Sequence, residues 1–464
     1  MIASLFTKGL GIITTPLFTR IMTTAEIGEF STFSSWYSII GVVATLSLSS
    51  GAFSLAMFEF PDKRDGYSSS MLGLSFCSAS VTAIVYCINP QFWNRILSLN
   101  TIEVVVMLTA FFVIPATEYR MVRLRYEYKY KTLITISLTN AVCGTMLSIA
   151  AVLISKYFNV TNLAVPRITG LYFALGAMGL ANGIYIIAKG KSLFNNRFWK
   201  FAFINNTPLI VNALAKHILE ISDRTMITNM VGKSETGIYS TLYTVSTLSL
   251  IVWSAIEANL LPYMFENLKN HTESKLSHII KPLLVSFAGV CYLLALVAPE
   301  IVRILATDEY YQAIYIMPPV VCGVFFTSVY NIFGDVLLYH KKTYLIMIST
   351  IVAAVLNLVL NYFFILKCGY RAASYTTLVC YLILAVMQYI FMRIVHHEKV
   401  FDTGFIVLIS LMFVVCSMSC LFLYKFIWIR YAIALALAFV AFVLRKRLVA
   451  LFKGMKKKVA HDES

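Results

Sequence analysis

Long apolar stretches alternate with short polar connections along the whole chain. Each stretch is close to the roughly 20 residues that an α-helix needs to cross a hydrocarbon core of ~30 Å. The pattern predicts fourteen spans, at about 2–20, 30–52, 68–90, 102–122, 133–155, 167–188, 201–222, 236–258, 281–302, 311–335, 343–366, 371–393, 403–424 and 428–446. A lipid-exposed backbone must satisfy its hydrogen bonds within the segment, and the short alternating segments of an outer-membrane barrel are absent. We therefore expect an all-α polytopic membrane protein.

Composition excludes an ordinary soluble domain. Of the 464 residues, 59% are hydrophobic and 13% are charged, whereas soluble domains carry about 25% charged residues. The nine cysteines fall in or beside spans without CxxC pairing, which indicates packing residues and not a disulfide framework or a metal centre. The first span begins almost at Met1, so we expect no cleavable signal peptide, and a start codon further upstream stays open.

Lysine and arginine are distributed unevenly between the two sets of alternate loops. The set on the side of the two termini holds more than twice as many of them as the opposite set. Cytoplasmic loops retain basic residues, so we expect a multi-pass membrane protein with both termini in the cytoplasm. The formal net charge of +16 then reflects topology, and contact of the tail at 445–458 with membrane lipids, more than a nucleic-acid partner.

A short motif occurs twice, as "GEFST" from Gly28 and as "GIYST" from Gly237. In both copies an arginine ends one span, a short loop follows, and the motif opens the next span. An even number of spans separates the copies, so the chain is predicted to contain two parallel six-helix bundles, a pattern common in secondary transporters. The expected parts are an N-lobe (1–190), a C-lobe (191–395), helices 13 and 14 (396–447) and a basic cytoplasmic tail (448–464).

Polar residues form a stripe along the first helix of each expected half. In the seventh span the stripe contains Asn205, Asn212, Lys216, Glu220 and Asp223, bordered by His217 and Arg224. In the first span it contains Ser4, Lys8, Gly11, Thr15 and Thr19, and it ends beside Arg20. Charged groups within spans are costly and usually face a cavity or a partner. Two stripes at equivalent positions therefore predict a water-filled central cavity between the lobes.

The side chains of this cavity favour an anionic substrate. Lys8, Arg20, Asn212, Lys216, His217 and Arg224 are predicted to bind a phosphate or diphosphate, and Glu220, Asp223 and Glu257 to exchange the H⁺ or Na⁺ that drives transport. We expect no other cofactor. A structural interpretation stays open, in which Lys216 and Glu220 neutralise each other and the terminal arginines anchor span ends. The basic and aromatic loop at 118–131 is explained by topology, with a headgroup landing site as the alternative.

Three segments resemble a known family. "DRTMITNMVGKSETGIYS" (223–240), "NLVLNYFFILKCGYRAASYTT" (357–377) and "TRIMTTAEIGEFS" (19–31) are similar to motifs of the polysaccharide transporter family, the Wzx-type flippases of the MOP superfamily. Asp223, Arg224, Gly237 and Tyr239 match its motif residue by residue. Cys368 and Arg371 stand where many members have Pro and Gly, so the turn between helices 11 and 12 is expected to differ.

The resemblance implies a MATE/MOP-like fold and a function. Such flippases move undecaprenyl-diphosphate-linked oligosaccharide repeat units from the cytoplasmic to the periplasmic leaflet for O-antigen, capsule or exopolysaccharide synthesis. It also implies ion-coupled alternating access through a V-shaped cavity between the two lobes, with a glycan polymerase and a chain-length regulator as partners. Two alternatives stay open: a MATE-like exporter of drugs or of another polyprenyl precursor, and a membrane glycan polymerase or ligase. Because the chain has no P-loop, HExxH or Gly-x-Ser-x-Gly motif, an enzyme is disfavoured.

Overall fold

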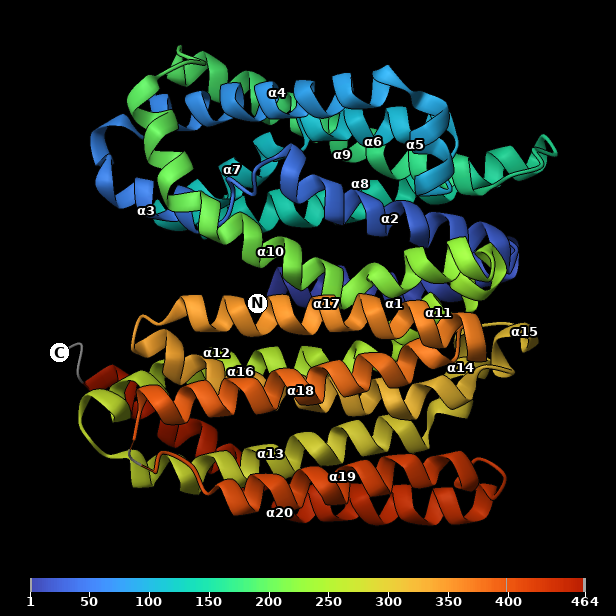
Figure 1. Cartoon of the computed structure of the whole chain (residues 1–464), viewed down its shortest axis with the longest axis vertical. Coiled ribbons are helices and arrows are strands. Elements are labelled where there is room, and N and C mark those ends of the chain that lie inside the picture. The colour runs from blue at the N-terminus through green and yellow to red at the C-terminus, as the bar shows by residue number, and fades with distance from the viewer. Residues whose placement is uncertain (1, 398, 462–464) are drawn as a thin grey trace. The chain divides into compact units, whose positions relative to one another are not determined.

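The computed structural model describes residues 2–397 and 399–461, and every regular element in them is helical (Figure 1). The helices are α1 Ile2–Ile21, α2 Thr24–Ala44, α3 Gly51–Glu59, η1 Pro61–Lys63, α4 Arg64–Ile88, α5 Pro90–Leu97, α6 Thr101–Val113, α7 Pro115–Tyr126, α8 Tyr130–Tyr157, α9 Ala164–Gly190, α10 Asn196–Met230, α11 Lys233–Ser246, η2 Thr247–Ser249, α12 Leu250–Lys269, α13 Glu273–Leu296, α14 Ala298–Leu305, α15 Asp308–Tyr311, η3 Ile314–Ile316, α16 Met317–Tyr339, α17 Thr343–Cys368, α18 Ala372–Val395, α19 Thr403–Leu423 and α20 Ile427–His461. The predicted all-α class is confirmed.

Among the described residues, ten helical segments are long and apolar enough to cross a membrane. The other predicted spans, near 2–20, 30–52, 201–222 and 428–446, coincide with α1, α2–α3, α10 and α20. Polar and charged residues lower the hydropathy of α10, and serine, threonine and glutamate residues lower that of the 21-residue α2. Length and apolar character alone therefore do not identify these helices as spans. The count of fourteen stays a prediction.

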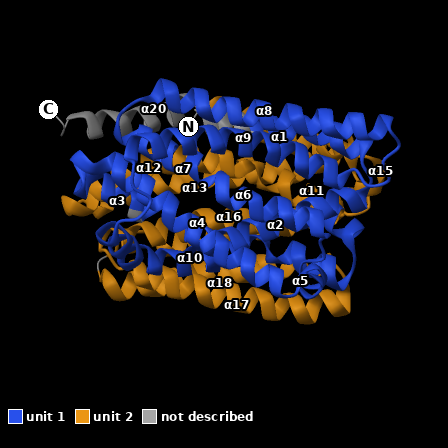
Figure 2. Ribbon diagram, turned by 90° about the horizontal axis from the view of Figure 1, so that it is seen from above, with its two compact units in different colours: residues 1–237 blue, residues 238–464 orange. Residues whose placement is uncertain are grey.

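Contacts divide the chain into two compact units, Met1–Gly237 and Ile238–Ser464 (Figure 2). This division comes after α10, whereas the repeat places the end of the first lobe at residue 190. The lobe boundaries therefore stay a prediction. Each unit is described below by itself.

Unit 1 is built around packed aromatic rings. α8 lies along α9, α9 contacts α4, α6 and α7, and α10 packs against α2 (Figure 1). The rings of Phe53 and Tyr119 stack at 5.1 Å, and both side chains are fully buried. A second cluster holds the rings of Tyr37 and Phe111 at 5.1 Å. These aromatic contacts fix the helices that carry the polar residues discussed below.

Unit 2 has α16 at its centre. Of the membrane-length window in Ile314–Tyr339, 83% is buried, a far larger share than in the other spans. α16 packs against α18, α13 and α19, and α17 covers α18 (Figure 1). Phe325 on α16 lies 4.5 Å from Phe413 on α19 between ring centroids. A helix buried on all sides must carry small and apolar residues around its whole circumference, and the sequence of α16 does.

Several predicted spans and loops are wrong in detail. The expected span 30–52 ends at Ala44, after which Leu46 and Ser47 adopt left-handed φ values of 51° and 44°. Asn206 on α10 donates a hydrogen bond to the exposed carbonyl oxygen of Leu46, which satisfies the broken helix end. The expected loop at 118–131 is helical up to Tyr126, because α7 continues the direction of α6 after Pro115.

The two copies of the repeated motif contact each other within unit 1. A Cβ atom at Gly28 would lie 1.7 Å from the carbonyl oxygen of Lys233, and one at Gly237 would lie 1.9 Å from that of Thr24. Hydroxyl pairs surround this crossing, with Thr24 to Ser234 at 2.7 Å and Thr32 to Thr228 at 2.6 Å. Glycine is required at both positions because the backbones of α2 and α11 touch there.

We expect Gly28→Ala and Gly237→Ala to destabilise the protein by about 1–3 kcal/mol each, since an added methyl group must separate two backbones. Thermal unfolding of the purified protein measures this effect. Gly289→Ala, on α13, is the matched control because nothing lies within 4 Å of its added Cβ atom. That control should be neutral or stabilising by up to about 1 kcal/mol. Equal melting temperatures for all three variants and the wild type would contradict the close crossing.

A buried arginine joins α20 to the rest of unit 2. Arg430 is 3% exposed and donates to both carboxylate oxygens of Glu300, at 2.9 and 2.7 Å, and to the carbonyl oxygen of Leu296 at 2.8 Å. A bidentate pair of this kind fixes the orientation of both partners.

Replacing Arg430 by Met should cost about 3–5 kcal/mol, because it leaves the Glu300 carboxylate without its partner. Lys425→Met, which removes an exposed cation five residues before Arg430, serves as the control. The readout is the yield of folded protein and its melting temperature. An unchanged melting temperature for Arg430→Met would show that the pair contributes nothing.

Candidate functional site

The polar stripe of the seventh expected span lies on α10. Lys216 and Glu220 are close there, with Nζ to Oε1 at 3.9 Å, and their side chains are 59% and 35% exposed. His217 is half-buried, and so is Asn212. The 3.9 Å between Nζ of Lys216 and Oε1 of Glu220 is at the outer limit for an ion pair. The ammonium group of Lys216 is therefore accessible to an anion. The structure brings these four residues together on one helix.

Asp223 and Arg224 differ from the rest of the stripe. Asp223 is 2% exposed, and its Oδ1 accepts a hydrogen bond of 2.8 Å from the backbone N–H of Arg224. The carbonyl oxygen of Arg224 accepts from the hydroxyl of Thr228, which belongs to the glycine crossing. The Asp-Arg pair of the family motif is thus packed at the end of α10, and the side chain of Asp223 is buried in the protein.

The matching stripe on α1 is described only in part. The side chain of Lys8 lies outside the described residues, and Arg20 is exposed at the end of the helix. The hydroxyls of Thr15 and Thr19 donate to the carbonyl oxygens four residues earlier, at 2.8 and 3.0 Å. These hydroxyls are therefore satisfied within their own helix, as is usual for Thr in membrane helices.

Unit 2 places a second carboxylate near Glu257. Glu257 lies on α12, and Asp335 on α16 interacts with it electrostatically. The sequence alone does not join Asp335 to Glu257, because the two residues belong to different helices that are distant along the chain. Two carboxylates inside spans form a chemically reasonable site for a proton or a cation.

A buried network of amides and hydroxyls joins α17 to α18. Asn361 donates to Oδ1 of Asn357 at 3.0 Å, Thr376 donates to Asn361, and Asn357 reaches the hydroxyl of Thr377 at 3.5 Å. Asn357 and Asn361 are fully buried. These residues belong to the segment 357–377 that resembles the family, but their mutual contacts could not be read from the motif alone.

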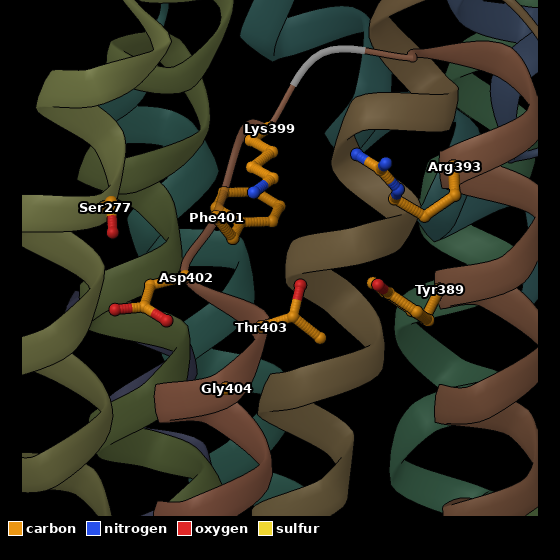
Figure 3. A pocket seen from close by; sticks show the side chains of 8 residues that line it. All are labelled: Ser277, Tyr389, Arg393, Lys399, Phe401, Asp402, Thr403 and Gly404. Atoms are coloured by element: carbon orange, nitrogen blue, oxygen red, sulfur yellow. The ribbon is translucent and has the colours of Figure 1, made fainter.

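An open pocket of about 540 Å³ lies where the α18–α19 connection meets α13 (Figure 3). Arg393 and Lys399 line it together with Tyr389 and Thr403. Asp402 is held by Lys281 at 2.5 Å and by the backbone N–H of Phe405 at 3.2 Å. These two hydrogen bonds lower the pKa of Asp402. The pocket thus combines two cations with hydroxyl donors, which suits an anionic group.

The basic segment at 118–131 is largely occupied by internal contacts. Arg120 donates to Asn182 at 2.7 Å, and Arg123 forms ion pairs with Asp65 and with Glu127, the latter at 2.5 Å. Burial disfavours the ionised form of Glu127, but the hydrogen bonds from Lys129 and Arg123 outweigh it and lower its pKa. Arg125 and Lys131 are the exposed cations that a headgroup could reach, beside Lys129, which also pairs with Glu127.

Within the part of the chain that the structure describes, no three His, Cys, Asp or Glu side chains gather in a way that could hold a metal ion. The nine cysteines are free thiols.

Comparison with known proteins places these features in a family. Residues 1–268 match the family described as "Polysaccharide biosynthesis protein". The chain is 23% identical over 220 residues to the probable low-salt glycan biosynthesis flippase Agl15 of Haloferax volcanii. That match covers 45% of this chain and 47% of the relative, so it spans about half of the relative's length.

Two solved structures show the same fold. The lipid II flippase MurJ, in an inward closed conformation, superposes with a TM-score of 0.70 at 15% identity, over 96% of this chain and 99% of that chain. An inward-facing multidrug resistance MATE family transporter of the MOP superfamily gives a TM-score of 0.61 at 13% identity, over 84% and 94% of the two chains. The predicted MATE/MOP-like fold is confirmed, and the chain is a multi-pass membrane protein. Because the family match extends over more than half of its residues, this chain belongs to the polysaccharide biosynthesis protein family.

Proposed function

We propose that this protein is a flippase for glycans linked to a polyprenyl diphosphate. The observation that carries the proposal is the family match over residues 1–268, in a chain with the fold of MOP transporters. A polysaccharide pathway that assembles its repeat units on a membrane lipid needs a protein to transfer them between leaflets. A multi-pass fold of this type provides the required passage for a polar headgroup.

The diphosphate is the part of the substrate that this chain is equipped to bind. Lys216 is exposed on α10, and Arg20 is exposed at the end of α1. Together with Lys8 and Arg224 they would supply the positive charge that a diphosphate requires in a low-dielectric passage, with Asn212 and His217 as hydrogen-bonding neighbours. Sugar hydroxyls would bind to the amides and hydroxyls along the same helices.

Acidic residues would couple transport to an ion. Glu257 and Asp335 interact in unit 2, and Glu220 lies beside Lys216 on α10. Two neighbouring carboxylates hold a proton or a Na⁺ more readily than one, because their mutual repulsion is relieved on binding. Asp223 is buried and hydrogen-bonded, so it would act as an enclosed member of such a site.

The finer features of the proposal follow the family resemblance. The carrier would be undecaprenyl diphosphate, the direction from the cytoplasmic to the periplasmic leaflet of the inner membrane, and the product O-antigen, capsule or exopolysaccharide. Both termini would lie in the cytoplasm, and a glycan polymerase with its chain-length regulator would use the flipped units. The protein itself would act as a secondary transporter and not as an enzyme.

Deleting the gene should trap lipid-linked repeat units on the cytoplasmic leaflet, because their transfer is lost. The measurement is surface polysaccharide together with the amount of lipid-linked oligosaccharide on each leaflet. Single units that accumulate on the periplasmic leaflet would instead indicate a missing polymerase. Normal glycan with increased drug sensitivity would favour a MATE-like exporter.

In the complemented deletion strain, we expect Lys216→Ala and Arg224→Ala each to lower surface glycan at least about tenfold, which corresponds to about 1.4 kcal/mol of lost substrate interaction. Protein level in the membrane should stay normal. Lys156→Ala is the control, since Lys156 is an exposed cation outside the stripes. If both stripe variants support normal glycan, the assignment of the diphosphate site is wrong.

Glu257→Gln and Asp335→Asn should uncouple transport from the ion, since each removes one ionisable group of the pair while keeping its shape. Glycan transfer in vesicles should then lose its response to an imposed H⁺ or Na⁺ gradient but keep its slow downhill rate. Glu309→Gln, at an exposed acidic residue on α15, is the matched control. A full gradient response in both pair variants would exclude Glu257 and Asp335 from coupling.

A further inference from the structure

The pocket at the α18–α19 connection of unit 2 contains cations that belong to neither polar stripe (Figure 3). Arg393 stands in the last turn of α18, Lys399 belongs to the connection that follows, and Thr403 is the first residue of α19. Both helices are long and apolar enough to cross a membrane. The pocket therefore lies where two spans meet the membrane surface, at the depth of the lipid headgroups.

Packed aromatic rings hold the walls of this pocket in place. On α16, the ring of Phe333 lies 5.4 Å from that of Tyr389 on α18 and 6.0 Å from that of Phe401 in the connection, between ring centroids. Val400 and Phe401 are both buried, so the connection is anchored beside the pocket. Lys399, which directly precedes them, is exposed. The pocket is thus built into the packing of unit 2.

The carboxylate that lines the pocket has a cation of its own. Asp402 turns toward α13 (Figure 3), where its Oδ2 lies 2.5 Å from Nζ of Lys281. Its Oδ1 accepts a hydrogen bond of 3.2 Å from the backbone N–H of Phe405, which caps the start of α19. Lys399 attracts Asp402 less strongly than Lys281 does. Arg393 and Lys399 line the pocket in addition to the pair of Asp402 with Lys281.

Neutral hydrogen-bond donors accompany these two cations. Arg393 and Tyr389 extend from α18 toward Thr403 at the start of α19 (Figure 3). The first backbone N–H groups of α19 have no carbonyl partner within their own helix, and they add partial positive charge at this point. Guanidinium, ammonium and hydroxyl groups are the donors from which phosphate oxygens accept hydrogen bonds. The pocket therefore suits a phosphate group.

The apolar surface beside the pocket favours a phosphate that is attached to a lipid. Ile390 and Ile394 on α18, and Val407 and Leu411 on α19, are exposed. These side chains follow the pocket along the two helices toward the hydrocarbon core, where acyl chains lie. A phospholipid contacts both the polar and the apolar surface, whereas inorganic phosphate contacts only the polar one.

We propose that Arg393 and Lys399, with the hydroxyl groups of Tyr389 and Thr403, bind the phosphate of an anionic membrane phospholipid. The lipid phosphate joins the end of α18 to the start of α19, and so stabilises the packing of α19 against α13 and α16. With both termini in the cytoplasm, as proposed above, the site faces the cytoplasmic leaflet. Binding of the lipid does not depend on the proposed flippase activity.

Native mass spectrometry of the full chain, purified in detergent and mixed with dioleoylphosphatidylglycerol, tests the site. We expect wild type to retain this lipid more strongly than dioleoylphosphatidylcholine, whose choline group offsets the phosphate charge. Lys399→Met should lower the retained phosphatidylglycerol at least about fivefold, the contribution of one basic residue at an anionic membrane surface. Lys399 is exposed in a connection, so its replacement leaves the fold intact. Tyr389→Phe removes one hydroxyl but keeps the ring, and should lower retention about twofold or more.

Lys342→Met is the matched control. Lys342 is exposed in the turn after α16 and does not line the pocket. It belongs to the same end of unit 2, because His340 in that turn lies 3.0 Å from His396 after α18, between Nε2 and Nδ1. This control should retain the lipid as wild type does. Equal retention in wild type, Lys399→Met and Tyr389→Phe overturns the proposal. An equal loss in Lys342→Met also overturns it, since that result reflects attraction to the basic surface as a whole.

Inorganic phosphate distinguishes a lipid site from a site for free anions. The melting temperature of the protein in detergent is measured with phosphatidylglycerol, with sodium phosphate, and with sodium chloride at equal ionic strength. We expect phosphatidylglycerol to raise the melting temperature of wild type and Lys342→Met more than that of Lys399→Met, and phosphate to act no more strongly than chloride. A rise with phosphate alone that Lys399→Met abolishes would assign the pocket to free phosphate and overturn the lipid as its occupant. Neither measurement uses glycan transfer, so failure of the flippase proposal would leave these results unchanged.

Discussion

Inside a bilayer, a polar group must find its hydrogen-bond partner within the protein, and this constraint determines most of what the chain does. At helix breaks and at buried charges, nearby groups of the protein supply the hydrogen-bond partners. Where α2 ends, the amide of Asn206 reaches the free carbonyl oxygen of Leu46. Where α20 begins, Arg430 is enclosed by Glu300 and a backbone carbonyl oxygen. The hydroxyls of Thr15 and Thr19 return to their own helix. Because ordinary polar residues are satisfied in this way, those that stay exposed or incompletely paired become informative.

The same constraint explains why small residues matter so much. Lipid tails are as apolar as Leu or Val, so helices in a membrane associate through close packing and through hydrogen bonds between their side chains. The crossing of α2 and α11 uses both, with two glycines in backbone contact and pairs of hydroxyls on either side. The repeated motif therefore has a physical meaning in unit 1. Each of its glycines leaves the room that the backbone of the other helix occupies.

The sequence predicted what single helices can reveal. Hydropathy located the helical segments, and the motifs at 223–240 and 357–377 led to the correct family and fold. It did not reveal the break after Ala44, because "TLSLSSG" is compatible with a continuing helix unless Asn206 is known to be near. Nor did it reveal the electrostatic interaction of Asp335 with Glu257. Periodicity describes one helix at a time, whereas this pair joins helices that are distant in sequence. The sequence identified Asp223 as a motif residue, but its burial follows from packing that no projection of α10 could show.

Binding an anionic substrate and binding a coupling ion require side chains with different exposure and charge. In the proposed function, a diphosphate that passes through the protein would have to exchange its ligands, so the cations that receive it would have to be accessible and only weakly paired. Lys216, at 3.9 Å from Glu220 and more than half exposed, has that character. A coupling proton has to be held and released at a defined step, which requires carboxyl groups removed from water and close to another charge. Asp335 and Glu257, which are half-buried and interact electrostatically in unit 2, are the candidates for that role. If the same carboxylates also had to bind the substrate, their charge would repel it. In the proposed function, different residues would therefore bind the anionic lipid and the coupling ion.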